Sequence, residues 1–252
     1  MGIGCDNMFK VRNEKIIFNN NFNFDNLEYI GSGGNSKVYR LKIDDEYYAL
    51  KIFDNPNYFS LKSFEQKLDL NIPSFISPIK LSYLNENFNG YLMKLCRGNN
   101  LQEQNLEISI DDFIKNADRL FYDTLMLSES KYLIQDLRKA NVMFDNGFKI
   151  IDIDFYEYCP GWFLNDLIKD KESIIKYNRK CVTQMLIDVF VLNAKINKLF
   201  EQENELNALK NNCIMGKISL KDFLNILCGW VYCNEKYRDM QIQDIGKRLI
   251  KK

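Results

Sequence analysis

The 252-residue sequence contains no histidine. No imidazole can therefore act as a general base, assist a nucleophile or bind a metal ion anywhere in the chain. This absence excludes Ser-His-Asp and Cys-His catalysis and every zinc site that needs histidine. Any chemistry must depend on carboxylates, lysine, cysteine, amides or a bound ion.

Other signals are missing as well. The seven cysteines are odd in number and include no CxxC pair, which argues against a disulfide framework and favours reduced thiols in a cytoplasmic protein. No apolar run approaches the roughly 18 residues that span a bilayer, so we expect no membrane span, and no signal peptide is visible. Gly2 and Cys5 hint at acylation, but Asp6 stands where Ser or Thr is usual.

An excess of charge of either sign is absent. Lys plus Arg and Asp plus Glu both number 34, so the formal net charge is zero. This balance argues against a nucleic-acid partner, because dedicated nucleic-acid-binding proteins usually have a basic excess. With 46% hydrophobic and 27% charged residues, the composition is typical of a globular protein with one large domain or two small lobes.

Residues 1–93 are predicted to be rich in strands. Helical spacing indicates one helix in this part, Tyr58–Leu70, with Phe59, Phe64 and Leu68 as buried positions. The expected strands are Leu27–Ile30, Lys37–Ile43, Glu46–Phe53, Ile79–Leu84 and Gly90–Leu95.

The pattern becomes helical after Gly98. Apolar residues at spacings of three and four predict helices over Ile110–Ser128, Lys180–Phe200 and Ile218–Cys228, the last capped by Ser219. Short strands are expected at Tyr132–Ile134, Val142–Phe144 and Lys149–Ile153. Trp230, Tyr232 and Cys233 are expected to pack in the interior. The sequence therefore predicts an α+β fold, a β-rich lobe followed by a mainly helical one.

The run Ile30–Tyr39 has the form G-x-G-x-x-S-x-V. Glycines at positions 31, 33 and 34 would let backbone amides approach a polyphosphate, because no Cβ is in the way. The alternative is an ordinary glycine-rich hairpin turn. A predicted strand follows, whereas Rossmann and Walker-type loops open a helix, so the pattern favours a hairpin flap over phosphates.

Lys51 lies inside an apolar strand. Burying an ammonium without a partner costs several kcal/mol, so phosphate oxygens and a carboxylate on the next helix are its natural partners. The only glutamate between Lys51 and Asn85 is Glu65. The alternatives are that Lys51 reaches water from an edge strand and that Glu65 is a solvated surface charge.

Two carboxylates and an amide follow at short spacing in the second lobe. Asp136 and Asn141 are five residues apart before an apolar strand, and Asp152 emerges from the next strand. Asn141 and Asp152 supply hard oxygen donors of the kind that Mg²⁺ prefers. Each aspartate taken singly could merely cap a turn.

In this order the motifs resemble those of the protein-kinase-like superfamily, over about Tyr29 to Asp154, or roughly half of the chain. The resemblance implies a two-lobed fold with an N-terminal lobe over 1–93, a hinge over 94–97 and a C-terminal lobe over 98–252. It also implies that the protein binds ATP and Mg²⁺.

Residue roles follow from the resemblance. The catalytic residues would be Asp136, Lys51 and Arg138, and the metal ligands Asn141, Asp152 and Asp154. Met93 would be the gatekeeper. The nucleotide-binding residues would be Gly31, Gly33, Gly34, Ser36, Val38, Ala49, Lys51, Glu65, Met93, Lys94, Leu95, Cys96 and Met143.

The sequence also departs from the family pattern. Ile134-Gln135-Asp136 replaces H-R-D, so the arginine that reads a phosphorylated activation loop is missing. Asp152-Ile153-Asp154 replaces D-F-G, and Asp154 would bind a second Mg²⁺ or hydrogen-bond the catalytic loop. No A-P-E follows, and only about 25 residues are expected between Asp154 and the next helix, which implies a shortened peptide platform.

Three functions remain open. The first is a protein kinase that transfers the γ-phosphate of ATP to a Ser or Thr hydroxyl, favoured by the complete set of motif residues. The second is a small-molecule kinase of the aminoglycoside or choline type, which would phosphorylate a small alcohol and is favoured by the missing A-P-E. The third is a non-catalytic scaffold that keeps the fold.

Overall fold

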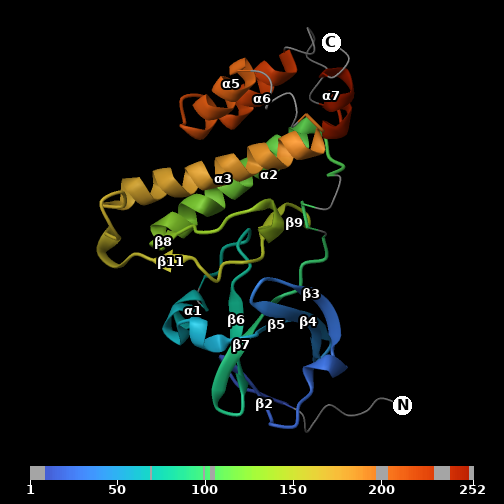
Figure 1. Ribbon diagram of the computed structural model, residues 1–252, viewed down its shortest axis with the longest axis vertical. Helices are drawn as coiled ribbons and strands as arrows, with labels where there is room; N and C mark the ends of the chain where they lie inside the picture. Colours follow the sequence, from blue (N-terminus) through green and yellow to red (C-terminus); the bar gives the residue numbers. More distant parts are fainter. Residues whose placement is uncertain are drawn as a thin grey trace. The chain divides into compact units, whose positions relative to one another are not determined.

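The computed structural model describes residues 9–68, 70–98, 100–102, 106–196, 204–229 and 239–249, and it divides into two compact units, residues 1–97 and 98–252 (Figure 1). The first unit holds a seven-stranded sheet, and the described residues include six α-helices, so the expected mixture of α and β structure is confirmed. The predictions for Gly2, Cys5, Trp230, Tyr232 and Cys233 lie outside the described residues.

The sheet of the first unit has the order β1-β2-β6-β7-β5-β4-β3. All neighbouring strands are antiparallel except β2 and β6. Its strands are β1 (Phe9–Val11), β2 (Lys15–Phe18), β3 (Glu28–Ser32), β4 (Ser36–Ile43), β5 (Glu46–Phe53), β6 (Pro78–Leu84) and β7 (Asn87–Lys94). The sequence patterns predicted β3 to β7 but not the N-terminal hairpin β1–β2.

Two tight turns set the register of this sheet. Asp44 and Asn85 both adopt left-handed backbone angles, with φ of 52° and 58°, which short hairpin loops require and which Asp and Asn tolerate well. The second turn corrects the prediction, because β7 begins at Asn87 and not at Gly90. Gly90 instead allows a close approach, since a Cβ there would clash with the backbone carbonyl oxygen of Lys51.

The helix of the first unit, α1, spans Leu61–Lys67 and is shorter than predicted. Pro56 opens a separate 3-10 turn over Pro56–Tyr58, which ends the helical pattern upstream. Phe64 of α1 is fully buried and packs against Phe53 and Tyr91, with ring centroids 5.5 and 5.4 Å away. An aromatic cluster therefore attaches α1 to the sheet.

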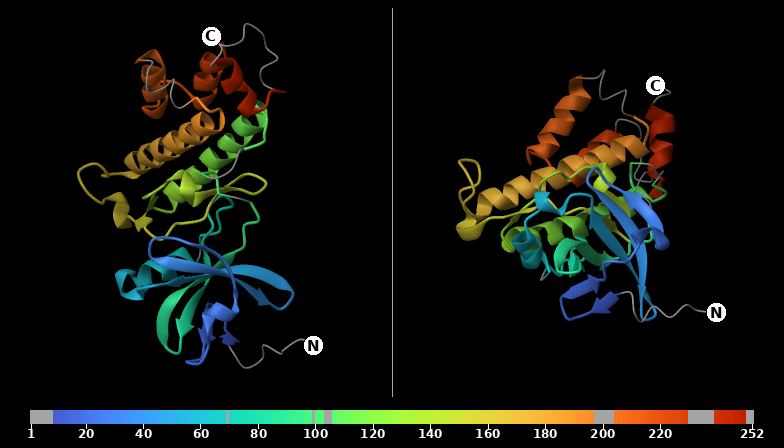
Figure 2. Two further views of the ribbon diagram at one scale, coloured as in Figure 1. Left: turned by 45° about the vertical axis from the view of Figure 1, so that its right-hand side comes forward. Right: turned by 60° about the horizontal axis from the view of Figure 1, so that its bottom comes forward.

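The second unit begins with two long helices, α2 (Ile110–Glu129) and α3 (Lys171–Asn193), which run side by side (Figures 1 and 2). Between them lie the strands β8 (Tyr132–Leu133), β9 (Val142–Phe144), β10 (Phe148–Ile150) and β11 (Glu157–Tyr158). They are followed by α5 (Asn204–Ile214), α6 (Leu220–Gly229) and α7 (Ile242–Leu249).

Helix α3 begins nine residues earlier than predicted. Its first turns are polar, which concealed them from an apolar periodicity, but Asp170 and Ser173 form a reciprocal capping box. The segment between Asp154 and α3 is therefore only the 16 residues Phe155–Asp170, shorter than the expected 25. The predicted strand Lys149–Ile153 ends at Ile150.

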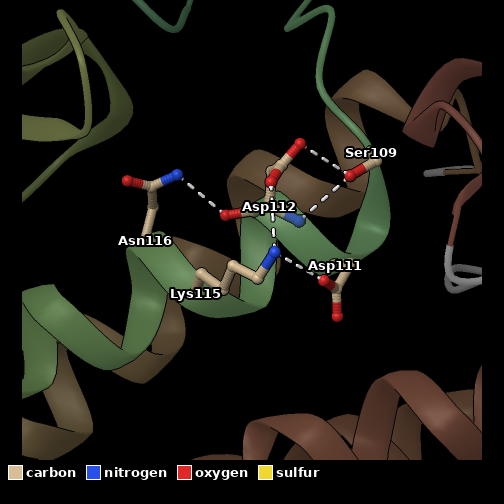
Figure 3. Close-up of polar contacts among 5 residues, drawn as sticks. All are labelled: Ser109, Asp111, Asp112, Lys115 and Asn116. Atoms are coloured by element: carbon tan, nitrogen blue, oxygen red, sulfur yellow. Dashed lines mark hydrogen bonds and ion pairs between the residues drawn. The ribbon is translucent and has the colours of Figure 1, made fainter.

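The start of α2 shows how the chain fixes a helix end (Figure 3). The Ser109 hydroxyl accepts a hydrogen bond from the Asp112 backbone N–H at 3.0 Å and donates one to its carboxylate at 2.8 Å. The Lys115 ammonium lies 2.8 Å from the Asp111 carboxylate. The Ser109 hydroxyl thereby satisfies a backbone N–H that the helix cannot satisfy internally. Within the described residues, no helix is both long and apolar enough to span a membrane.

Candidate functional site

The glycine-rich turn joins β3 to β4. Its closing hydrogen bond runs from the Gly33 N–H to the Ser36 carbonyl at 2.9 Å, and Ser36 is buried. A Cβ built on Gly31 or Gly34 would meet no atom within 4 Å, and neither residue has a left-handed φ. Neither packing nor backbone conformation therefore demands glycine there. Open space above a bare backbone leaves room for a ligand to approach the amides.

One face of the sheet carries the residues expected to contact the nucleotide. Residues directly opposite each other in an antiparallel pair point to the same face. The register sets Val38 opposite Lys51, Lys51 opposite Tyr91, and Ala49 opposite Met93. These side chains therefore share a face, although they come from three strands.

The opposite face of the same strands is the apolar core of the unit. Leu41, Leu50 and Leu92 pack there against Ile16 and Phe18 from β2. Because alternate residues of a strand point to opposite faces, this core fixes the direction of Lys51. The Lys51 side chain is buried, with its Nζ 5.8 Å from the centre of the Tyr91 ring.

Glu65, the predicted partner of Lys51, lies on α1 with its side chain exposed. Burial, and then the charge of Glu65, raise the pKa of Tyr83 in β6. The role of Glu65 in nucleotide binding stays a prediction.

The expected hinge residues end the first unit. Lys94 is the exposed last residue of β7, and Leu95 and Cys96 follow, half-buried and outside any regular element. Met93, the predicted gatekeeper, is buried on the face that carries Ala49.

In the second unit, Asn178 of α3 holds the start of the loop that contains Asp136. Its side-chain oxygen accepts the Ile134 N–H at 2.8 Å, and its nitrogen donates to the Tyr132 carbonyl at 2.7 Å and the Ser128 hydroxyl at 2.9 Å. Asn178 is fully buried. Ile134 stands where the kinase-like family has histidine. Its side chain is also fully buried, a position that an apolar residue fills well.

Asp136 has a left-handed backbone, with a φ of 54°. Asp adopts this region more readily than most non-glycine residues, and here it sets the direction of the loop. The Asn141 side chain donates to the Asp136 carbonyl at 2.8 Å, which stabilises this conformation. The exposed Asp136 carboxylate accepts a 2.6 Å hydrogen bond from the Arg138 guanidinium.

Backbone hydrogen bonds bring the second aspartate loop to the first. The Ile151 N–H donates to the Asn141 carbonyl at 3.0 Å, directly before Asp152. The Asp154 N–H lies 3.4 Å from the Asp152 carboxylate oxygen, and Asp154 is buried. Asp136, Asn141, Asp152 and Asp154 are thus linked within one small part of this unit.

Tyr156 lies beside these carboxylates and was not predicted. Its side chain is buried, and burial raises the pKa of its phenol well above the ordinary value. Cys181, Asp152 and Asp136 raise that pKa further through their negative charges. Both aspartates are therefore near enough to Tyr156 to influence its pKa.

Met143, predicted to form the adenine floor, lies in β9 opposite Lys149 and forms an isolated bridge with Asn100. Gly98 lies close by, since a Cβ there would clash with the Phe144 carbonyl oxygen. The turn after β9 uses Asn146 and Gly147, both with positive φ.

The acidic residues do not form a preassembled metal cage. Within the described residues, no group of three or more Asp, Glu or Cys side chains is arranged to hold a metal. Asn141 and Asp152 nevertheless suit Mg²⁺, which takes few protein ligands together with phosphates. The Asn141 amide nitrogen donates a hydrogen bond to the Asp136 carbonyl. The amide oxygen of Asn141, which is the atom that would bind a metal ion, therefore points away from that hydrogen bond.

Two residues missed from the sequence organise this site. Asn178 lies in the polar part of α3 that periodicity did not reveal, and Glu157 binds the Gln135 side chain at 2.6 Å. A polar residue at a buried helix position would have been the only signal for Asn178.

Comparison with models of known protein families gives no match, and comparison with curated proteins gives no significant relative.

Proposed function

We propose that this protein is a Mg²⁺- and ATP-dependent phosphotransferase of the protein-kinase-like type, which transfers the γ-phosphate of ATP to a Ser or Thr hydroxyl of a protein. The observation that carries the proposal is the loop at Asp136. Asp136, in a left-handed conformation, is tied to Asn141, and Asn141 is tied to the strand end that presents Asp152. A carboxylate, an amide and a second carboxylate in this order suit phosphoryl transfer.

The first unit supports the same function through its own residues. The open glycine turn would bind phosphate oxygens through backbone N–H groups, and Lys51, on the strand after that hairpin, would neutralise their charge. Val38 and Ala49 share the face of Lys51 and would cover an adenine ring. Lys94 to Cys96 would offer backbone groups to its edge.

In the second unit, Asn141 and Asp152 would hold Mg²⁺, with Asp154 as a third ligand. When bound, the ion would neutralise charge on the phosphates. Asp136 would orient the acceptor hydroxyl and accept its proton, which requires its carboxylate to leave the Arg138 guanidinium. Arg138, with its five N–H donors, is then free to bind the γ-phosphate.

The test is Asp136→Asn in a labelled-ATP assay with Mg²⁺ and a generic protein acceptor. Turnover is expected to fall by on the order of 10²- to 10⁴-fold, because a positioned base contributes about that much, while the KM for ATP changes little. Asp166→Asn, which alters a fully exposed aspartate, is the matched control. Unchanged turnover of the Asp136 variant would contradict the proposal.

One observation favours a small-molecule acceptor as the second candidate. Only the 16 residues Phe155–Asp170 separate Asp154 from α3, which leaves little chain for a peptide platform. Labelling of aminoglycosides or choline, with no labelling of protein, would favour this alternative. ATP binding without any transfer would favour the scaffold, and a thermal shift with ATP detects it, since ligand at 100 times its Kd stabilises by about 2.7 kcal/mol.

A further inference from the structure

Gln135 and Glu157 form a side-chain hydrogen bond across two loops of the second unit. The Gln135 amide nitrogen donates to the Glu157 carboxylate at 2.6 Å, and both side chains are half-buried. A hydrogen bond to an ionised acceptor is stronger than one between neutral groups. Partial shielding from water preserves more of that strength.

This hydrogen bond connects two segments that are distant in the sequence. Gln135 directly precedes Asp136, and Glu157 comes three residues after Asp154. The bond therefore joins the segment that carries the proposed base to the segment that carries the proposed metal ligands.

The backbone around the bond aligns the same two segments. In the β8–β11 pair, Glu157 lies opposite Leu133 and Tyr158 opposite Tyr132. The Cys159 N–H donates to the Lys131 carbonyl at 2.8 Å, which extends the pairing by one step. Gln135 lies two residues beyond Leu133, so its bond to Glu157 is a diagonal contact that continues the ladder after the two-residue strand ends.

We propose that Gln135 and Glu157 are a positioning pair that fixes Asp136 relative to Asp152 and Asp154. Neither residue touches the reacting atoms. The inference rests on the proposed phosphotransfer, and it assigns a role to the glutamine that replaces the family's arginine. Asp136 lies in an irregular loop with left-handed backbone angles, so a support directly before it controls where its carboxylate lies.

The experiment compares single and paired variants of the intact protein. In Gln135→Ala and Glu157→Ala, kcat is expected to fall by on the order of 10- to 100-fold, because small displacements at a reacting centre have effects of that size, while the KM for ATP stays within about twofold. Gln135→Glu alone sets two carboxylates against each other and is expected to be at least as damaging. Adding Glu157→Gln to it restores an amide–carboxylate bond in the opposite direction, and most of the activity should return.

The matched control is Gln184→Ala. Gln184 also donates to a carboxylate, that of Asp188 at 2.8 Å, but within α3. Its loss is expected to leave kcat unchanged. Hydrogen exchange without nucleotide gives a readout independent of activity: the peptide over 155–162 should exchange faster in the alanine variants and return to normal in the paired variant.

Each outcome decides between the two proposals. Normal kcat in the alanine variants, or failure of Glu157→Gln to rescue Gln135→Glu, overturns the positioning role while leaving phosphotransfer standing. A wild-type protein that labels neither protein nor small alcohols overturns phosphotransfer, and the positioning role falls with it.

Discussion

The two units hold their chemically important side chains in different ways. In the first unit, strand register and alternation direct Lys51, Val38 and Ala49 to one face, with regular backbone pairing on both sides. In the second unit, the strands have only two or three residues and cannot direct side chains in this way. Side-chain hydrogen bonds position the chain there instead, and they come from Asn178, Asn141 and Gln135. A sheet positions residues by repetition, whereas an irregular loop depends on particular side chains.

The difference predicts where each unit is vulnerable. Loss of one side chain from a register of eight-residue strands leaves the remaining ladder intact. Loss of Asn178 removes the partners of three groups at once, and two of them are backbone groups of the chain that leads into Asp136.

The largest expected effect is that of Asn178→Leu. The Ile134 N–H and the Tyr132 carbonyl lose their buried partner, and such unsatisfied groups cost about 1–3 kcal/mol each, so the free energy of unfolding should fall by roughly 2–6 kcal/mol. Urea unfolding followed by circular dichroism measures the change. Asn211→Leu, at an exposed position of α5, is the control and should shift it by less than about 0.5 kcal/mol. Equal effects of the two variants would refute the support role.

The second prediction separates two glycines of the first unit. Gly90→Ala forces a Cβ against the carbonyl of Lys51 and should cost about 1–3 kcal/mol, because packed backbone cannot move far. Gly34→Ala meets only open space and should leave stability within about 0.5 kcal/mol. Only Gly34→Ala should weaken ATP binding without loss of stability.

Urea unfolding and ATP titration of both variants check this contrast. If Gly34→Ala binds ATP as the wild type does, the glycine turn has no role in phosphate binding. If Gly90→Ala is as stable as the wild type, the β5–β7 register is less constrained than its geometry indicates.

The smallest expected effect concerns the Asp170 cap of α3. The backbone N–H of Ser173 and then its hydroxyl lower the pKa of the Asp170 carboxyl. Because the folded pKa lies below the unfolded value of about 3.9, the stabilisation is complete above that value and is lost as pH falls through the folded pKa.

Asp170→Asn keeps an acceptor oxygen but removes the charge. Its melting temperature should fall below that of the wild type near neutral pH, and the gap should narrow at a pH below the unfolded pKa of about 3.9. Thermal unfolding at the two pH values measures this convergence, with Asp166→Asn as an exposed control. A gap that stays constant with pH would show that the charge of Asp170 is not involved.

The sequence predicted the first unit better than the second. Alternating or apolar stretches located β3 to β7, and the run from Glu46 to Phe53 was predicted with its observed ends. The hairpin β1–β2 was missed because strands of three and four residues are too short to show an alternating pattern.

In the second unit the motif residues were found but their supports were not. Asp136, Asn141 and Asp152 stand out by spacing, whereas the partner of Gln135 is 22 positions away and that of Ile134 is 44 away. Such contacts depend on how the chain folds back, which a local pattern does not record.

Helix α3 also restricts how many residues can lie between its first turn and Asn178. Asp170 caps its first turn, and Asn178 reaches Ile134 from a point slightly more than two turns later. One residue inserted between them would rotate Asn178 by about 100° around the helix axis, away from all three partners. Insertions before Asp170 leave that angle unchanged. The stretch 163–167, which follows the β8–β11 pairing, is therefore where this chain can grow or shrink, and 171–178 is where its length is set.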